Sequence, residues 1–171
     1  MKYLKLTLIL ICMVTFVDRT SAQDFTTPAK YKLESQEDYT KLEPDILKCI
    51  DYLEAAPFDD DLDKQKRANA FFMKWLTGTA HVSVEILPYV MDLTKENKEF
   101  LLTFMGGWTK YALENPDSTE KAACHLAGLK AIIRVYQQNK TVEEDDAVAE
   151  LVTLDKEGKL NDWLQPKLKT K

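Results

Sequence analysis

The chain has 171 residues, of which 23 are basic and 28 are acidic, so its formal net charge is −5. A chain of this length can form one domain with a hydrophobic core of its own. An acidic protein is a poor electrostatic match for phosphate backbones and for anionic membrane surfaces. The composition therefore argues against a nucleic-acid partner.

Residues 1–22 predict a cleaved secretory signal peptide. Lys2 and Lys5 give a positive start, residues 6–17 are apolar or neutral, and small side chains precede Gln23. The run stops well short of the roughly 20 apolar residues that a membrane-spanning helix needs. We expect cleavage after Ala22, a secreted or periplasmic location and no stable membrane anchor after processing. Cleavage removes three basic side chains and one acidic one, which leaves a net charge of −7.

Residues 23–41 contain few apolar positions and predict an extended or disordered leader. A single helical domain is then expected over residues 42–171. Its first helix places Pro44 in the first turn, carries Ile46, Cys49 and Ile50 on one face, and ends at Pro57.

Four further helices follow from the apolar spacing and the residues that punctuate it. They are expected at about 61–76, from about 87 to 93, at 97–114 and at 117–138. The segment 80–94 is ambiguous, because Val82, Val84 and Ile86 alternate as in a strand before Pro88 permits a helix. Asp117 with Glu120 resembles a capping arrangement at the start of the 117–138 helix.

The 117–138 helix is apolar on nearly all sides, which is typical of a buried helix, so we expect it at the centre of the bundle. Gly106 and Gly107 interrupt the preceding helix at a cost of up to about 1 kcal/mol each relative to alanine. Close approach of another helix backbone would compensate for that cost. Gly128 is the expected point of contact.

The C-terminal part predicts two more helices. Thr141 with Glu144 forms a capping-box pattern before a helix through Leu154, Gly158 is the expected left-handed stop, and a short helix follows from Leu160. Six or seven helices joined by short turns predict an all-α fold, a compact helical bundle.

Two cysteines, Cys49 and Cys124, remain after processing. An even count in an oxidising compartment permits a disulfide between them. Two buried thiols that pack as small apolar side chains are the alternative.

Cys124 and His125 form the most distinctive local string, Lys121-Ala-Ala-Cys-His. Covalent haem attachment uses Cys-x-x-Cys-His, and here lysine replaces the first cysteine. His81 and Glu85 would share a helix face, but a zinc site needs three or four ligands. No nucleophile motif, phosphate loop or calcium loop is complete. The sequence therefore predicts no cofactor and no metal, and it favours a non-enzymatic protein over a haem or redox protein or enzyme centred on Cys124 and His125.

Aromatic side chains are frequent at helical spacing and include Trp75, Phe104 and Trp108. Such residues can line a pocket for an apolar ligand or a groove for a partner. They are also typical of core packing, which is the simpler interpretation. An open cleft lined by Trp75, Phe104 and Trp108 would favour ligand binding, whereas full enclosure of all three would indicate a scaffold role.

The signal ending Ser21-Ala22-Gln23 and the strings at residues 74–79 (KWLTGT) and 104–108 (FMGGW) resemble small secreted helical proteins of Bacteroidetes that carry no assigned function. The resemblance spans most of the mature chain and transfers no site residues. Our functional hypothesis is a secreted or periplasmic, non-enzymatic helical domain that binds a protein partner or a small apolar ligand.

Overall fold

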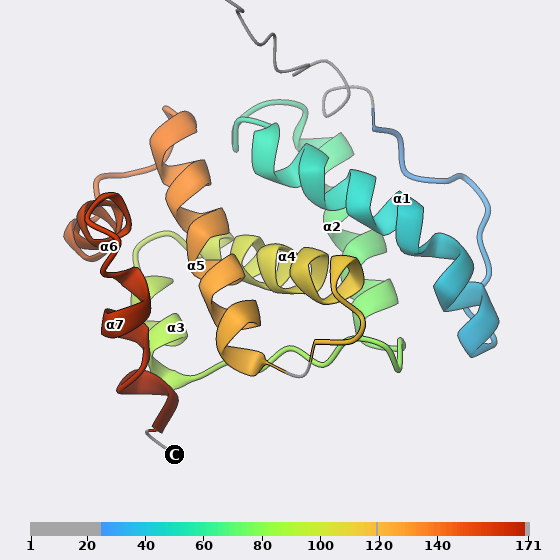
Figure 1. The fold of residues 1–171 in the computed structure, drawn as a ribbon. Helices are drawn as coiled ribbons and strands as arrows, with labels where there is room; N and C mark the ends of the chain where they lie inside the picture. Colours follow the sequence, from blue (N-terminus) through green and yellow to red (C-terminus); the bar gives the residue numbers. More distant parts are fainter. Residues whose placement is uncertain (1–24, 119, 170–171) are drawn as a thin grey trace, which may run out of the picture.

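The structure is a computed structural model that describes residues 25–118 and 120–169. This part of the chain forms seven α-helices, a short 3-10 helix and no strand, which confirms the predicted all-α class (Figure 1). The elements are α1 (Gln36–Ala55), α2 (Leu62–Leu76), α3 (Pro88–Leu93), α4 (Glu99–Glu114), α5 (Lys121–Gln138), α6 (Asp146–Lys156), α7 (Leu160–Leu164) and the 3-10 helix Lys167–Lys169. The predicted signal peptide lies outside the described residues.

The helices are arranged around α5. This helix contacts α1, α4, α6 and α7, while α4 also contacts α1 and α3. The α1–α2 pair lies at one end of the molecule and the α6–α7 pair at the other (Figure 1). The predicted central position of this helix is therefore confirmed. Within the described ranges, no helix combines the length and the apolar character that crossing a membrane requires.

The first helix begins earlier than the sequence predicted, at Gln36 instead of near residue 42. Ser35 is its N-cap: the Ser35 hydroxyl accepts from the Asp38 backbone N–H at 3.4 Å, and the Asp38 carboxylate accepts from the Ser35 N–H at 3.1 Å. Such a reciprocal capping box can start a helix in a polar stretch. Pro44 therefore lies inside α1 and not in its first turn.

Of the two alternatives predicted for residues 23–41, extended or disordered, the described segment before α1 is extended, but it packs against the domain, and residues 36–41 belong to α1. Phe25 is 7% exposed, and its ring centroid lies 5.8 Å from that of Tyr52. Tyr31 meets Phe71 edge to face, with ring centroids 5.0 Å apart. Aromatic contacts of this kind bury large apolar areas, and here they fix an extended segment on the α1–α2 pair.

Gly107 of α4 serves the close contact with α5 that the sequence predicted, whereas Gly106 faces Ile50 of α1. A Cβ built on Gly107 would lie 2.6 Å from the Ala131 Cβ and 2.7 Å from the Ala127 carbonyl oxygen, both on α5. A Cβ on Gly128 would lie 2.6 Å from the Phe104 ring. Neither position leaves room for a methyl group, so the absence of side chains sets the distance between α4 and α5.

Two of the predicted helix caps are wrong. The N-cap of α5 is Glu120 and makes no side-chain capping bond, and the N-cap of α6 is Asp145. The Asp145 carboxylate accepts from the backbone N–H groups of Ala147 and Val148 at 3.0 and 3.1 Å. Gly158, by contrast, adopts the predicted left-handed conformation, with φ of 71°.

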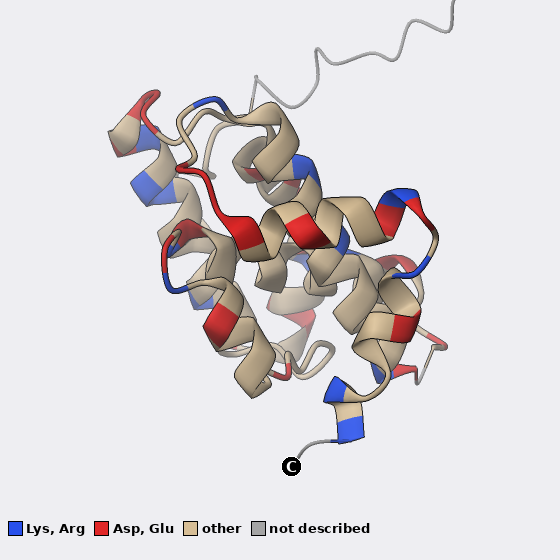
Figure 2. Cartoon of the chain, turned by 90° about the vertical axis from the view of Figure 1, so that its left-hand side faces the viewer, with Lys and Arg blue, Asp and Glu red and all other residues tan. Residues whose placement is uncertain are grey.

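Ion pairs fix α1 on its neighbours. The Arg134 guanidinium of α5 donates to both carboxylate oxygens of Glu54, at 2.7 to 3.0 Å. The Lys110 ammonium of α4 donates to the Asp51 carboxylate. Acidic and basic residues are interspersed on the α6–α7 side as well (Figure 2). The paired, bidentate geometry of Arg134 holds Glu54 at the edge of the site described below.

Candidate functional site

The three aromatic residues predicted to bind a ligand lie in the core. Trp75 and Phe104 are 0% exposed and Trp108 is 2% exposed, so they do not line an open cleft. The Trp75 indole N–H donates to the Tyr39 carbonyl at 2.9 Å, which satisfies its only polar atom. The structure therefore assigns them to packing, the simpler of the two interpretations.

Cys49 and Cys124 are both free and buried. The Cys49 thiol donates to the Ala68 carbonyl oxygen at 3.4 Å, and burial raises its pKa to about 12. Burial also raises the pKa of the Cys124 thiol. Because the thiolate is the reactive form, both side chains behave as small apolar core residues in this structure, not as partners in a disulfide.

The buried His125 is the centre of a polar network that extends to the surface. Its Nε2 donates to the Glu85 carboxylate at 3.4 Å, because a carboxylate can only accept, and its Nδ1 then accepts from the Tyr89 hydroxyl at 2.7 Å. The Glu85 carboxylate also accepts from the Lys121 ammonium at 3.3 Å. The Trp108 ring meets the imidazole edge to face at 4.6 Å between centroids. Both ring nitrogens are thus satisfied by the protein.

The pKa values of this network follow from burial and from its hydrogen bonds. Removal from water lowers the pKa of His125, against the raising effect of Glu85. The hydrogen bond from His125 and that from Lys121 lower the pKa of Glu85, while burial raises the pKa of Tyr89. His125 is 0% exposed, so a substrate does not reach the imidazole.

The arrangement around His125 does not fit an axial haem ligand. An axial histidine needs one ring nitrogen directed at the iron, and both nitrogens of His125 are engaged by Tyr89 and Glu85. The neighbouring Cys124 thiol has a raised pKa and is buried. The hypothesis of a haem, redox or enzyme centre at Cys124 and His125 therefore finds no support in the geometry.

His81 and Glu85 do not form the pair that a shared helix face would give. Residues 82–87 have no helical structure, and His81 Nδ1 lies 2.6 Å from the Glu43 carboxylate of α1. Glu85 belongs instead to the His125 network. Across residues 25–118 and 120–169, no three metal-ligating side chains gather at one point.

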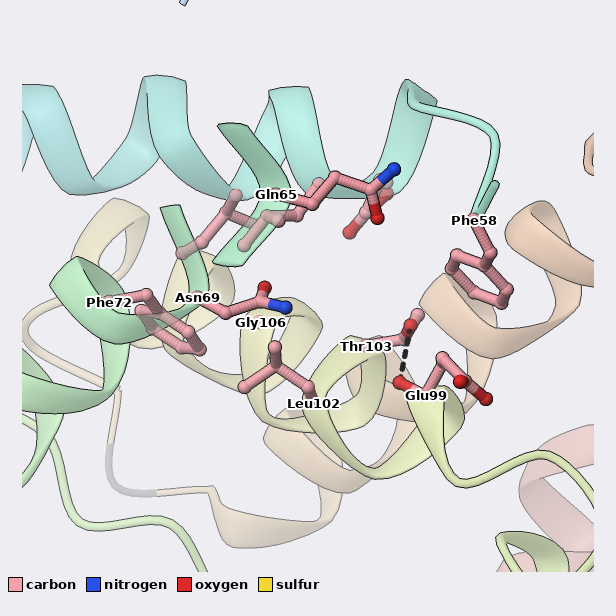
Figure 3. A pocket seen from close by; sticks show the side chains of 11 residues that line it. Phe58, Gln65, Asn69, Phe72, Glu99, Leu102, Thr103 and Gly106 are labelled. Carbon is pink, nitrogen blue, oxygen red and sulfur yellow. Dashed lines mark hydrogen bonds between the residues drawn. The ribbon is translucent and has the colours of Figure 1, made fainter. Parts of the chain in front are cut away.

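A narrow groove lies between α1, α2 and α4. Its walls combine apolar and polar side chains, and its cavity volume is about 60 Å³. Phe58 stands at one end and Phe72 at the other, with Leu102 and Gly106 of α4 between them (Figure 3). The lining residues are Ile50, Leu53, Glu54, Phe58, Gln65, Asn69, Phe72, Glu99, Leu102, Thr103 and Gly106.

Several polar groups of the groove already have partners within the protein. The Thr103 hydroxyl donates to the Glu99 carbonyl at 3.1 Å (Figure 3), and the Gln65 amide donates to the Pro57 carbonyl at 2.6 Å. Glu54 is held by Arg134. Asn69 differs, because its side-chain oxygen is buried without any hydrogen-bond partner. A buried acceptor left unpaired costs free energy, so a function that uses it would explain its presence.

No pattern in the sequence predicts this groove. Its residues come from three helices and one loop, and most are half-buried, so a periodic pattern only indicates that they face inward. Gly106 is the one local signal: a Cβ there would lie 3.3 Å from Ile50 Cγ2, on the floor of the groove. Asn69 is a polar residue on α2 between the apolar residues Ala68 and Phe72. Its position among apolar residues could have indicated the groove.

Comparisons of this chain with protein-family models, with curated proteins and with solved structures find no match. The resemblance to secreted helical proteins of Bacteroidetes therefore stays a prediction.

Proposed function

We propose that this protein is a secreted or periplasmic, non-enzymatic helical domain, and that the groove between α1, α2 and α4 binds an apolar side chain of a protein partner. The observation that carries the proposal is the partly open apolar groove with an unpartnered buried oxygen, that of Asn69. The features of residues 1–22 support export. Their structure lies outside the described residues.

The size of the groove favours a side chain over a free metabolite. Sites for cofactors and other small molecules usually enclose about 300–1,000 Å³. The groove has about 60 Å³, which is space for the end of one side chain. A partner can insert one anchor there and gain its remaining affinity from the surrounding surface.

The walls of the groove are suited to such an anchor. Leu53 and Leu102 are half-buried, so each keeps some apolar surface that a bound group would cover. Covering apolar surface contributes roughly 25 cal/mol for each Å². The groove is already formed in the free protein, so binding needs no rearrangement of α1, α2 or α4.

The experiment is a titration of the purified, isotope-labelled protein with 1-pentanol, which stands in for an aliphatic side chain. We expect saturable shifts of NMR signals from groove residues such as Leu53, Phe58 and Leu102. A Thr103→Phe variant should abolish them, because the ring fills the groove. Absence of saturable shifts at these residues in the unsubstituted protein would overturn the proposal.

Thr153→Phe is the matched control. Thr153 lies on α6, outside the groove, and its hydroxyl donates to the carbonyl four residues earlier, as that of Thr103 does. Both variants therefore lose the same backbone contact and gain the same ring. Only Thr103→Phe should lose the pentanol shifts.

A further inference from the structure

Both hydrogen-bond partners of the buried His125 side chain come from one short stretch of chain. Tyr89, in α3, donates its hydroxyl proton to Nδ1 at 2.7 Å, and Glu85, four residues earlier, accepts from Nε2 at 3.4 Å. Residues 82–87 have no helical structure, and the helix α3 that follows them has only six residues. We call residues 82–93 the strap. When the strap lifts, the imidazole loses both of its partners at once.

The strap also covers aromatic rings. Tyr89 is 8% exposed, and its ring meets that of Trp163 edge to face, with centroids 5.7 Å apart. The imidazole beneath it packs against Phe104 and Trp108 of α4, with ring centroids at 5.9 and 4.6 Å. Lifting the strap would therefore admit water to His125 and to the rings that surround it.

Of the described residues, two charged side chains act on the imidazole, and their effects oppose each other. Glu85, from the strap, favours the protonated imidazole, whereas Lys121, the first residue of α5, disfavours it. Lys121 also pairs with Glu85 at 3.3 Å, but its side chain is 68% exposed, so this ion pair contributes little to holding the strap. The other contacts are the Tyr89 hydroxyl of α3 and the rings of Phe104 and Trp108 of α4, which are uncharged at neutral pH.

The hydrogen bonds of the strap require a neutral imidazole. A neutral ring has one donor and one acceptor nitrogen, which is what Glu85 and Tyr89 need. A protonated ring donates from both nitrogens, so the Tyr89 hydroxyl would have to accept and its own proton would lose its acceptor. Burial acts in the same direction, because it lowers the pKa of His125. A proton therefore binds His125 more tightly when the strap is lifted.

We propose that residues 82–93 form an acid-sensitive strap, which opens more often when His125 is protonated and then uncovers the aromatic rings beneath it. The strap lines no part of the groove between α1, α2 and α4, so this inference is independent of the proposed function. An imidazole in water has a pKa of about 6.5 and is almost fully protonated at pH 5. Opening can therefore become up to about 30-fold more frequent at pH 5 than at pH 7.5.

The test is hydrogen exchange of the purified protein, followed by mass spectrometry at pH 7.5, 6.5 and 5. Each rate is divided by that of an unstructured amide at the same pH, which gives the protection in the folded state. We expect the amides of α3 to be less protected than those of α2, and to lose up to about 30-fold of their protection between pH 7.5 and 5. Low urea concentrations should accelerate exchange in α2 more than in α3, because a local opening exposes little surface. Protection of α3 that equals that of α2, or that does not change with pH, overturns the proposal.

The two histidines of the chain provide a matched pair of variants. His81 is the other histidine, and its partly exposed side chain lies 2.6 Å from the Glu43 carboxylate. Glutamine offers a donor and an acceptor at every pH, so it replaces only the neutral imidazole. We expect His125→Gln to abolish the pH dependence of protection in α3 and His81→Gln to preserve it. A dependence that persists in His125→Gln, or that disappears in His81→Gln, overturns the assignment to His125.

Tyr89→Phe tests the strap without a change at His125. This variant keeps the ring that packs on Trp163 and removes the hydroxyl that donates to His125. We expect it to lower the protection of α3 at pH 7.5 already, so the hydrogen bond is tested even if His125→Gln does not fold. Unchanged protection in Tyr89→Phe would show that this bond does not hold the strap, which contradicts the proposal.

Discussion

The Asn69→Leu substitution should stabilise the protein. The Asn69 side-chain oxygen is buried without a partner, and leaving such an acceptor unpaired costs about 1–3 kcal/mol. Since the residue as a whole is only half-buried, we take the lower end, about 1 kcal/mol. Leucine also has a better helix propensity than asparagine by up to about 0.5 kcal/mol. The free energy of unfolding should therefore rise by about 1 to 1.5 kcal/mol, or roughly 3–5 °C in Tm.

The assay is urea unfolding followed by circular dichroism, with thermal unfolding as a second measurement. The midpoint should rise while the slope m stays constant, because the surface exposed on unfolding hardly changes. Asn69→Ala separates the two causes: it improves helix propensity further but loses the side-chain contacts. We expect the Asn69→Leu variant to be more stable than the Asn69→Ala variant. A leucine variant less stable than the unsubstituted protein would refute the reasoning, because it would mean that the Asn69 oxygen is satisfied.

Three further predictions concern the core. Gly107→Ala should lower stability by about 1–3 kcal/mol despite better helix propensity, because its Cβ would lie 2.6 Å from a neighbouring Cβ on α5; urea unfolding measures this, and a stabilised variant would contradict it. The depressed pKa of His125 means that the unfolded state binds a proton more readily, so stability should fall as pH falls through about 6.5. His125→Gln should flatten that decrease in urea midpoints measured from pH 7.5 to 5. Cys49 and Cys124 should resist iodoacetamide at pH 8 in the folded protein, and both should react with it in urea without reductant. Mass spectrometry measures the reaction, and two cysteines that stay unreactive in urea would show a disulfide.

Helix periodicity predicted the parts of the fold that bury one strong apolar face. The helices α2, α4 and α5 lie close to their predicted bounds, because a stripe of large apolar residues has to face the core wherever the helix packs. Gly107 and Gly128 were also interpreted correctly from the cost of glycine inside a helix. In each case the local sequence pattern is compatible with only one favourable way of packing the helix against the rest of the protein.

The start of α1 shows where local pattern fails. Residues 36–41 are mostly polar, and Pro44 resembles a helix start, so apolar spacing places the boundary too late. The helix extends because Ser35 and Asp38 satisfy the first backbone N–H groups. The extended segment before it is fixed by Phe25 and Tyr31, whose aromatic partners are distant in sequence. Their contacts depend on packing between elements, which periodicity does not describe.

The candidate site could not be predicted from the sequence, for a related reason. The predicted pair His81 and Glu85 is close in sequence, whereas in the structure Glu85 contacts His125, forty positions later. The groove combines residues from Ile50 to Gly106 and contains no motif. Asn69 is significant only because its side-chain oxygen has no hydrogen-bond partner, and this can be seen only in the folded structure.

Two polar side chains, His125 and Asn69, illustrate how the structure separates a structural role from a binding role. His125 is fully buried, but Tyr89 and Glu85 satisfy both of its ring nitrogens, so the network is complete without a ligand. Asn69 lines the groove and is only half-buried, yet its side-chain oxygen is buried without a hydrogen-bond partner. The proposed binding role of the groove would explain why a polar group that costs stability in the free protein, and has no structural partner, is present there.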